Sequence, residues 1–126
     1  MSSIEDALRE ARALAAQRDW QMPNEATLAE AQRLLDLVGV EWPAPGVQAL
    51  ASGALVLEWE AGGDAGTRGW LTLTVVGQGT VEHAAVIDGD EYGLTEDFAD
   101  VLPGWANELL RRLHHAPELS PKRVLQ

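Results

Sequence analysis

The spacing of the apolar residues changes once along this chain, at a proline-rich segment, and this change decides the fold class. Before the segment, apolar residues recur at helical spacing and predict helices over residues 4–18 and 25–38, the second with Asn24 as N-cap and Gly39 at its end. The segment itself, WPAPG at 42–46, cannot continue a helix, because proline lacks a backbone donor and restricts the residue before it. Beyond it, apolar and polar residues alternate, as in half-buried strands.

The alternating part predicts an antiparallel meander of three or four strands. Residues 54–60 and 70–76 alternate clearly, 80–87 continue the pattern after a glycine turn, and 47–50 are a candidate first strand. Helical spacing returns in the segment PGWANELLRRLHH, which Pro117 ends. It places Trp105, Leu109 and Leu113 on one stripe that we expect to face the core. One face of the sheet needs cover, and the helices supply it. We therefore expect a two-layer α+β fold with two N-terminal helices and one C-terminal helix.

The length and the missing cysteines restrict the organisation further. A chain of 126 residues suits a single domain over 1–126, with flexible ends at 1–3 and 117–126. Without cysteine there are no disulfides, thiolate zinc sites or cysteine nucleophiles. No apolar run approaches the roughly 18 residues that cross a bilayer, and the first residues do not follow the signal-peptide pattern. We expect a cytoplasmic protein that does not bind membranes.

The net charge of −11 is concentrated in the middle of the chain. Residues 34–110 carry thirteen acidic residues against the single Arg68. In residues 111–126, by contrast, four basic residues face one acidic residue, Glu118. Such a field repels phosphates and anionic lipids, and it attracts cationic surfaces. Direct binding to nucleic acid is therefore not expected, and a basic protein surface is the natural partner.

The densest acidic segment is VIDGDEYGLTEDFAD at 86–100. Asp88 and Asp90 match positions 1 and 3 of a calcium-binding EF-hand loop, but Tyr92 at position 5 and Ala99 at position 12 do not fit. We expect instead an acidic turn that leads to a short helical turn capped by Thr95, with no bound metal or other cofactor. The six carboxylates of this segment are Asp88, Asp90, Glu91, Glu96, Asp97 and Asp100.

Groups for catalysis are not evident in the sequence. None of the four serines lies in a nucleophile-elbow motif, and six carboxylates in one loop lack the contrast in environment that acid–base pairs need. Alternation places His83 and Glu82 on opposite faces of one strand, and His114 and His115 suit the end of a helix. We therefore expect a protein that is not an enzyme.

One part of the chain resembles a group of known proteins. Trp20, the proline connector, the apolar-x-apolar-Glu-Trp strand LVLEW at 55–59 and the hairpin after it are similar to features of small uncharacterised bacterial and phage-borne proteins. The resemblance covers residues 19–86 and implies a shared scaffold without a transferable activity. Because residues 88–100 lie outside it, the role particular to this protein is expected there.

Two classes of function remain open. In the first, the protein is a non-enzymatic inhibitor whose anionic surface occupies the basic surface of a partner, such as a nucleic-acid-binding protein. Phage-encoded inhibitors of nucleic-acid machinery, including anti-CRISPR proteins, have similar size and charge. An antitoxin or immunity protein would bind a basic toxin through the same charge complementarity. In the second, the protein is a small metal-dependent hydrolase that uses the carboxylates of 88–97 and His83.

We prefer the first class. A third hypothesis is a housekeeping domain whose acidic residues serve only to keep it soluble. The predicted partner-binding residues are the six carboxylates and Trp70, which alternation places beside Thr72 and Thr74 on one face of the sheet. The sequence leaves the oligomeric state open.

Overall fold

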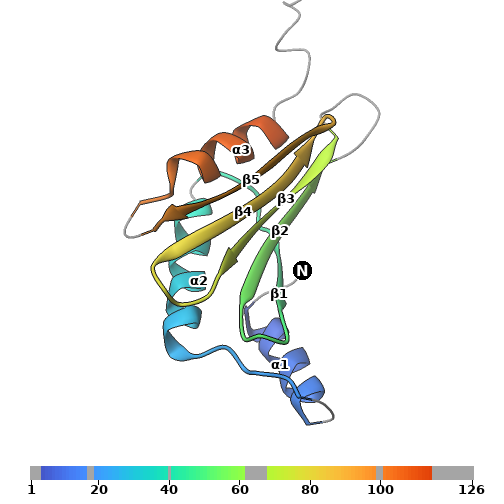
Figure 1. The fold of residues 1–126 in the computed structure, drawn as a ribbon, viewed down its shortest axis with the longest axis vertical. Coiled ribbons are helices and arrows are strands. Elements are labelled where there is room, and N and C mark those ends of the chain that lie inside the picture. The colour runs from blue at the N-terminus through green and yellow to red at the C-terminus, as the bar shows by residue number, and fades with distance from the viewer. Residues whose placement is uncertain (1–3, 17–18, 40, 62–67, 99–100, 115–126) are drawn as a thin grey trace, which may run out of the picture.

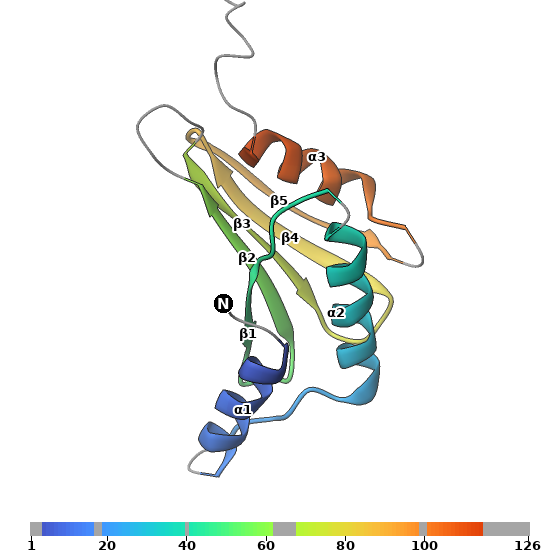
Figure 2. The same cartoon turned by 180° about the vertical axis from the view of Figure 1, so that it is seen from behind.

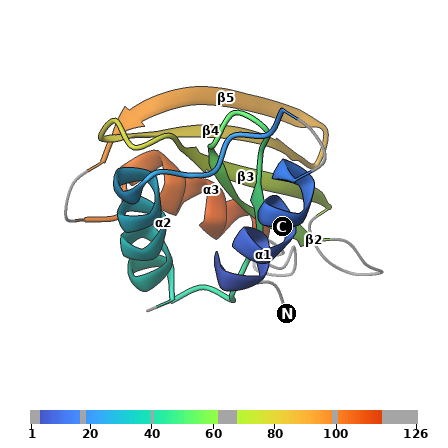
Figure 3. The ribbon, with the colours of Figure 1, turned by 90° about the horizontal axis from the view of Figure 1, so that it is seen from below.

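The structure, a computed structural model, describes residues 4–16, 19–39, 41–61, 68–98 and 101–114. The ends expected to be flexible lie outside these ranges. Within the described ranges, three helices lie on one side of a five-stranded sheet (Figures 1 and 3). In chain order the elements are α1 (Ile4–Ala15), α2 (Glu25–Val38), β1 (Gly46–Ala49), β2 (Leu55–Ala61), β3 (Gly69–Val75), β4 (Thr80–Ile87), β5 (Asp90–Asp97) and α3 (Gly104–His114).

The sheet is an antiparallel meander in which each strand pairs with the next, in the order β1-β2-β3-β4-β5. The α+β class is confirmed, but the expected three or four strands are wrong, because the acidic segment forms the fifth. Asp88 and Gly89, with φ of 51° and 89°, make the two-residue turn that joins β4 to β5. Thr95 lies within β5 and caps no helix.

All three helices cover the same face of the sheet (Figure 2). α1 packs on β1, α2 on β2 and β3, and α3 on β2, β3 and β4. The core between the layers is made of aliphatic side chains together with Trp59 and Phe98. The indole N–H of Trp59 donates to the carbonyl of Pro43 at 2.8 Å. Trp105, which the helical spacing placed in the core, is 44% exposed; the buried stripe of α3 is Ala106, Leu109, Leu110 and Leu113.

Local signals set the boundaries of α2 as the sequence predicted. The Asn24 side chain accepts a hydrogen bond from the backbone N–H of Thr27 at 2.8 Å, and Gly39 is the C-cap. Glu30 then ties this helix to the β3–β4 turn, since its carboxylate accepts the N–H groups of Gly77 and Gly79. Within the described part of the chain, no helix is long and apolar enough to cross a membrane.

Candidate protein-docking surface

The side of the sheet opposite the helices carries no described element over it, and we call it the open face (Figure 3). Strand alternation and the pairing register assign its side chains, because cross-strand partners point the same way. Within the five strands, no position of this face holds Lys, Arg or His; Arg68 stands just before β3. The acidic residues of the open face are Glu58, Glu60, Glu82, Glu91 and Asp97.

These five carboxylates have no part in holding the described fold together, unlike several acidic residues elsewhere. All five residues are exposed, and none of them has a hydrogen bond or ion pair with another described residue. By contrast, Asp6 pairs with Arg9, Asp88 accepts a backbone N–H, and Glu30 fixes a turn. The open-face acids therefore stabilise nothing in the described fold, and their charge faces solvent.

The middle of the open face is low, because its side chains are small. The register places Thr72, Ala84 and Gly93 side by side on β3, β4 and β5. Next to them lies a shallow depression of about 350 Å³, whose lining includes Thr74, Glu82, Ala84, Gly93 and Thr95. A group that projects from a partner can approach the sheet here.

Trp70 stands on the open face, where its side chain is exposed. The residue is 39% accessible, and its indole N–H donates no hydrogen bond to a described residue. No other strand position of the described open face holds an aromatic residue. Exposed Trp is over-represented among the residues that dominate protein interfaces, so Trp70 is a candidate anchor.

The structure separates the acidic residues that the sequence grouped together. In β5, alternation leaves Glu91 and Asp97 on the open face with Trp70, while Asp90 and Glu96 point to the helix side. Asp88 lies in the β4–β5 turn, and its Oδ1 accepts the N–H of Arg68 at 3.0 Å. Asp100 lies outside the described residues. Of the six carboxylates, the structure therefore places only Glu91 and Asp97 together on the open face, and their role in partner binding stays a prediction.

Glu96 has a structural task at the start of α3. Its Oε1 and Oε2 lie 3.1 Å from the backbone N of Trp105, and its Oε2 lies 3.2 Å from that of Ala106. These N–H groups belong to the first turn of the helix, where they have no acceptor within the helix. Glu96 thus acts as an N-cap supplied by a neighbouring strand, and its charge opposes the positive end of the helix dipole.

Behind Glu96 lies His83, which is buried in the core. Its Nε2 is 2.9 Å from Oε2 of Glu96, and its Nδ1 has no hydrogen-bond partner among the described residues. Burial lowers the pKa of His83 below the ordinary 6.5, and this effect outweighs the nearby carboxylate of Glu96, which raises it. The imidazole is therefore neutral at pH 7, and the pair is a core contact between neighbouring strands.

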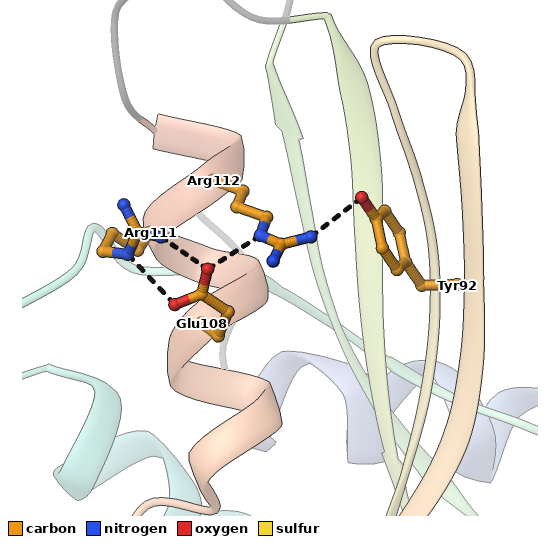
Figure 4. A network of polar contacts seen from close by, with 4 residues as sticks. All are labelled: Tyr92, Glu108, Arg111 and Arg112. Atoms are coloured by element: carbon orange, nitrogen blue, oxygen red, sulfur yellow. Dashed lines mark hydrogen bonds and ion pairs between the residues drawn. The ribbon is translucent and has the colours of Figure 1, made fainter. Parts of the chain in front are cut away.

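Two arginines of α3 form hydrogen bonds and ion pairs on the helix side of the sheet (Figure 4). Arg111 and Arg112 both donate to the carboxylate of Glu108, and Arg112 also donates to the Tyr92 hydroxyl at 3.0 Å. The hydrogen bond from Arg111, followed by that from Arg112, lowers the pKa of Glu108 to about 2. These arginines are held away from the open face, so they do not neutralise it.

Three open-face acids were missed by reasoning from the sequence: Glu58, Glu60 and Glu82. The signal was present, because alternation already placed Glu58 and Glu60 away from the core side of their strand. Among the described residues, no group of three or more His, Asp or Glu side chains could hold a metal ion. The carboxylates of 88–97 do not converge, since β5 directs them to opposite faces.

No protein-family model matches this sequence, and searches of the curated proteins and of the solved structures return no significant match. A function has to be inferred from the surface itself.

Proposed function

We propose that this protein is a small, non-enzymatic, cytoplasmic interaction protein whose open face binds the basic surface of another protein. The observation that supports this proposal is the set of five carboxylates without a partner in the described structure, which lie on the same uncovered sheet face as Trp70. A surface of one charge sign steers an oppositely charged partner and disfavours neutral or anionic ones.

An inhibitor of a nucleic-acid-binding protein is the version of this function that we prefer. Such a partner presents a basic surface that evolved to contact phosphates, and a negatively charged sheet of similar extent can occupy it. An antitoxin or immunity protein against a basic toxin would use the same open face. The metal-dependent hydrolase has no comparable support, because its proposed carboxylate ligands are divided between the β4–β5 turn and the two faces of β5.

The test compares two triple charge reversals in affinity purification from the native host. The first variant is Glu58→Lys, Glu82→Lys and Asp97→Lys, all on the open face. The matched control is Glu10→Lys, Asp19→Lys and Glu41→Lys, which changes exposed acids elsewhere by the same total charge. Both variants are first checked for folding by circular dichroism.

We expect the wild-type protein and the control to retain a basic protein that the open-face variant loses. With the partner identified and purified, binding to the wild type should weaken as salt rises, and the open-face variant should show a flatter salt dependence. Equal retention by the two variants would refute the proposal, since the open-face acids would then contribute no more to binding than exposed acids elsewhere.

A further inference from the structure

One row of side chains across the open face combines an aromatic ring with two carboxylates. Glu60, Trp70, Val86 and Glu91 are successive cross-strand partners on β2, β3, β4 and β5; we call them the Trp70 row. Directly opposite residues place their Cβ atoms about 5 Å apart. The indole of Trp70 therefore lies next to the Glu60 side chain, and Val86 separates it from Glu91.

The chemistry of the row fits a cation that also has an apolar surface. An indole ring attracts a cation placed over its face, and a neighbouring carboxylate adds an ion pair. A purely apolar partner does not fit, because Trp70 and Val86 form a small patch bounded by charge on both sides. An anionic partner is repelled by Glu60 and Glu91.

We infer that the Trp70 row is the recognition site for an arginine side chain of the partner, with the guanidinium stacked on Trp70 and paired with Glu60. The inference rests on the proposed function and names the group that the open face recognises. Arginine fits better than lysine, because its planar, weakly hydrated guanidinium stacks on aromatic rings and matches a carboxylate with two parallel donors. Glu91 lies three strand spacings from Glu60, about 14 Å away, and accepts a second cation.

A second copy of this chain is a poor occupant for the same row. Two open faces brought together would oppose five carboxylates with five others, and at most Arg68 at the edge of each face would offset them. Like charges that face each other across an interface repel and lower the affinity. Charge complementarity thus favours a basic partner over a symmetric dimer.

The test uses two peptide probes, acetylated and amidated hexa-arginine and hexa-lysine, which carry equal charge. Affinities for the full-length protein are measured by isothermal titration calorimetry, and the five tryptophan indole N–H signals are followed by NMR. Trp70→Ala assigns the signal of Trp70 and removes the ring, Trp70→Phe restores an aromatic face, and Glu60→Gln removes the adjacent charge. Because Trp70 is exposed, these variants are expected to fold, which circular dichroism verifies.

We expect hexa-arginine to bind at least about threefold more tightly than hexa-lysine and to shift the Trp70 signal. Trp70→Ala should abolish this preference, Trp70→Phe should keep part of it, and Glu60→Gln should weaken arginine binding. Equal affinity of both peptides, or a preference that survives in Trp70→Ala, would overturn the inference.

Failure of the inference and failure of the proposed function give different results. If both peptides bind equally but the open-face triple variant loses them, the open face binds cations and only the arginine site is wrong. If hexa-arginine binds the open-face triple variant as tightly as the matched control, and its preference over hexa-lysine also survives in Trp70→Ala, both the site and the proposed surface are wrong. A concentration-dependent dimer in analytical ultracentrifugation that Trp70→Ala dissociates would make a second copy the occupant and overturn the inference.

Discussion

Replacing Glu96 by alanine should destabilise the protein although the residue lies in an acidic, edge-strand segment. The wild-type carboxylate accepts the N–H groups of Trp105 and Ala106 at the first turn of α3, and it also contacts the buried His83. The change leaves these two N–H groups without a protein acceptor, and the one on Ala106 is partly buried. The helix also loses a negative charge at its positive end.

The magnitude follows from these two losses. Removing a capping acceptor costs about 1 kcal/mol, and losing a favourable charge at the helix N-terminus costs about 0.3–1 kcal/mol. The Glu96 side chain is only 18% exposed, so solvent screens the interaction little. We expect Glu96→Ala to lower the free energy of unfolding by about 1.5–2 kcal/mol, and Glu96→Gln, which keeps one acceptor oxygen, by about half of that.

Urea denaturation at pH 7.5, followed by tryptophan fluorescence and circular dichroism, measures the change through the midpoint and slope of unfolding. The matched control is Asp97→Ala, the next residue in β5, which points to the open face and has no partner among the described residues. It should change stability by less than about 0.5 kcal/mol. Equal effects of the two substitutions would refute the assignment of Glu96 as the cap of α3.

Two further predictions concern the sheet. Because burial holds the pKa of His83 below 6.5 in the folded state, the unfolded chain binds the proton first, so stability should fall as pH drops below about 6.5. Urea midpoints at pH 7.5, 6.5 and 5.5 should show a smaller decrease for His83→Leu than for the wild type, and parallel decreases would contradict the reasoning. Gly69→Ala should cost about 3 kcal/mol or more or prevent folding, because φ is 153° and an added Cβ would lie 1.9 Å from the carbonyl oxygen of Val86. Gly104→Ala, where an added Cβ meets nothing within 4 Å, is the control and should leave the thermal midpoint nearly unchanged.

The sequence predicted the elements whose apolar residues are strongly periodic. The α2 boundaries are those expected, because Asn24 and Gly39 act as caps, and the alternation of β2 to β4 is clear since their inner positions are buried. β5 was missed because it is an edge strand whose inward positions are at most half-buried. Tyr92 and Leu94 are its only large apolar residues, so its sequence lacks a clear apolar alternation. The Asp88–Gly89 pair is typical of a two-residue hairpin turn, but the segment was interpreted through its many carboxylates and this signal was not used.

The candidate site could be predicted only in part for a related reason. From the sequence alone, Glu91 was grouped with Glu96 because both belong to one acidic segment. Alternation along β5 instead places their side chains on opposite faces of the sheet. Glu60 and Glu91 are far apart in sequence, yet they lie in one row across the sheet. Predicting this row would have required the pairing register of four strands. The face on which Trp70 lies, shared with Thr72 and Thr74, was predicted correctly, because alternation within a single strand was sufficient.

The acidic edge strand also bears on aggregation. β5 ends the sheet, and eight residues of backbone on its outer side are not paired with another strand in the described structure. Such an edge is a template for a strand of another molecule, and like charges are one means by which proteins prevent that pairing. Asp90, Glu91, Glu96 and Asp97 would be brought against their own copies in any edge-to-edge stack. The protection should be weakest near the isoelectric point of about 4.5, where carboxylates take up protons and the protein is most prone to form sheet-like aggregates.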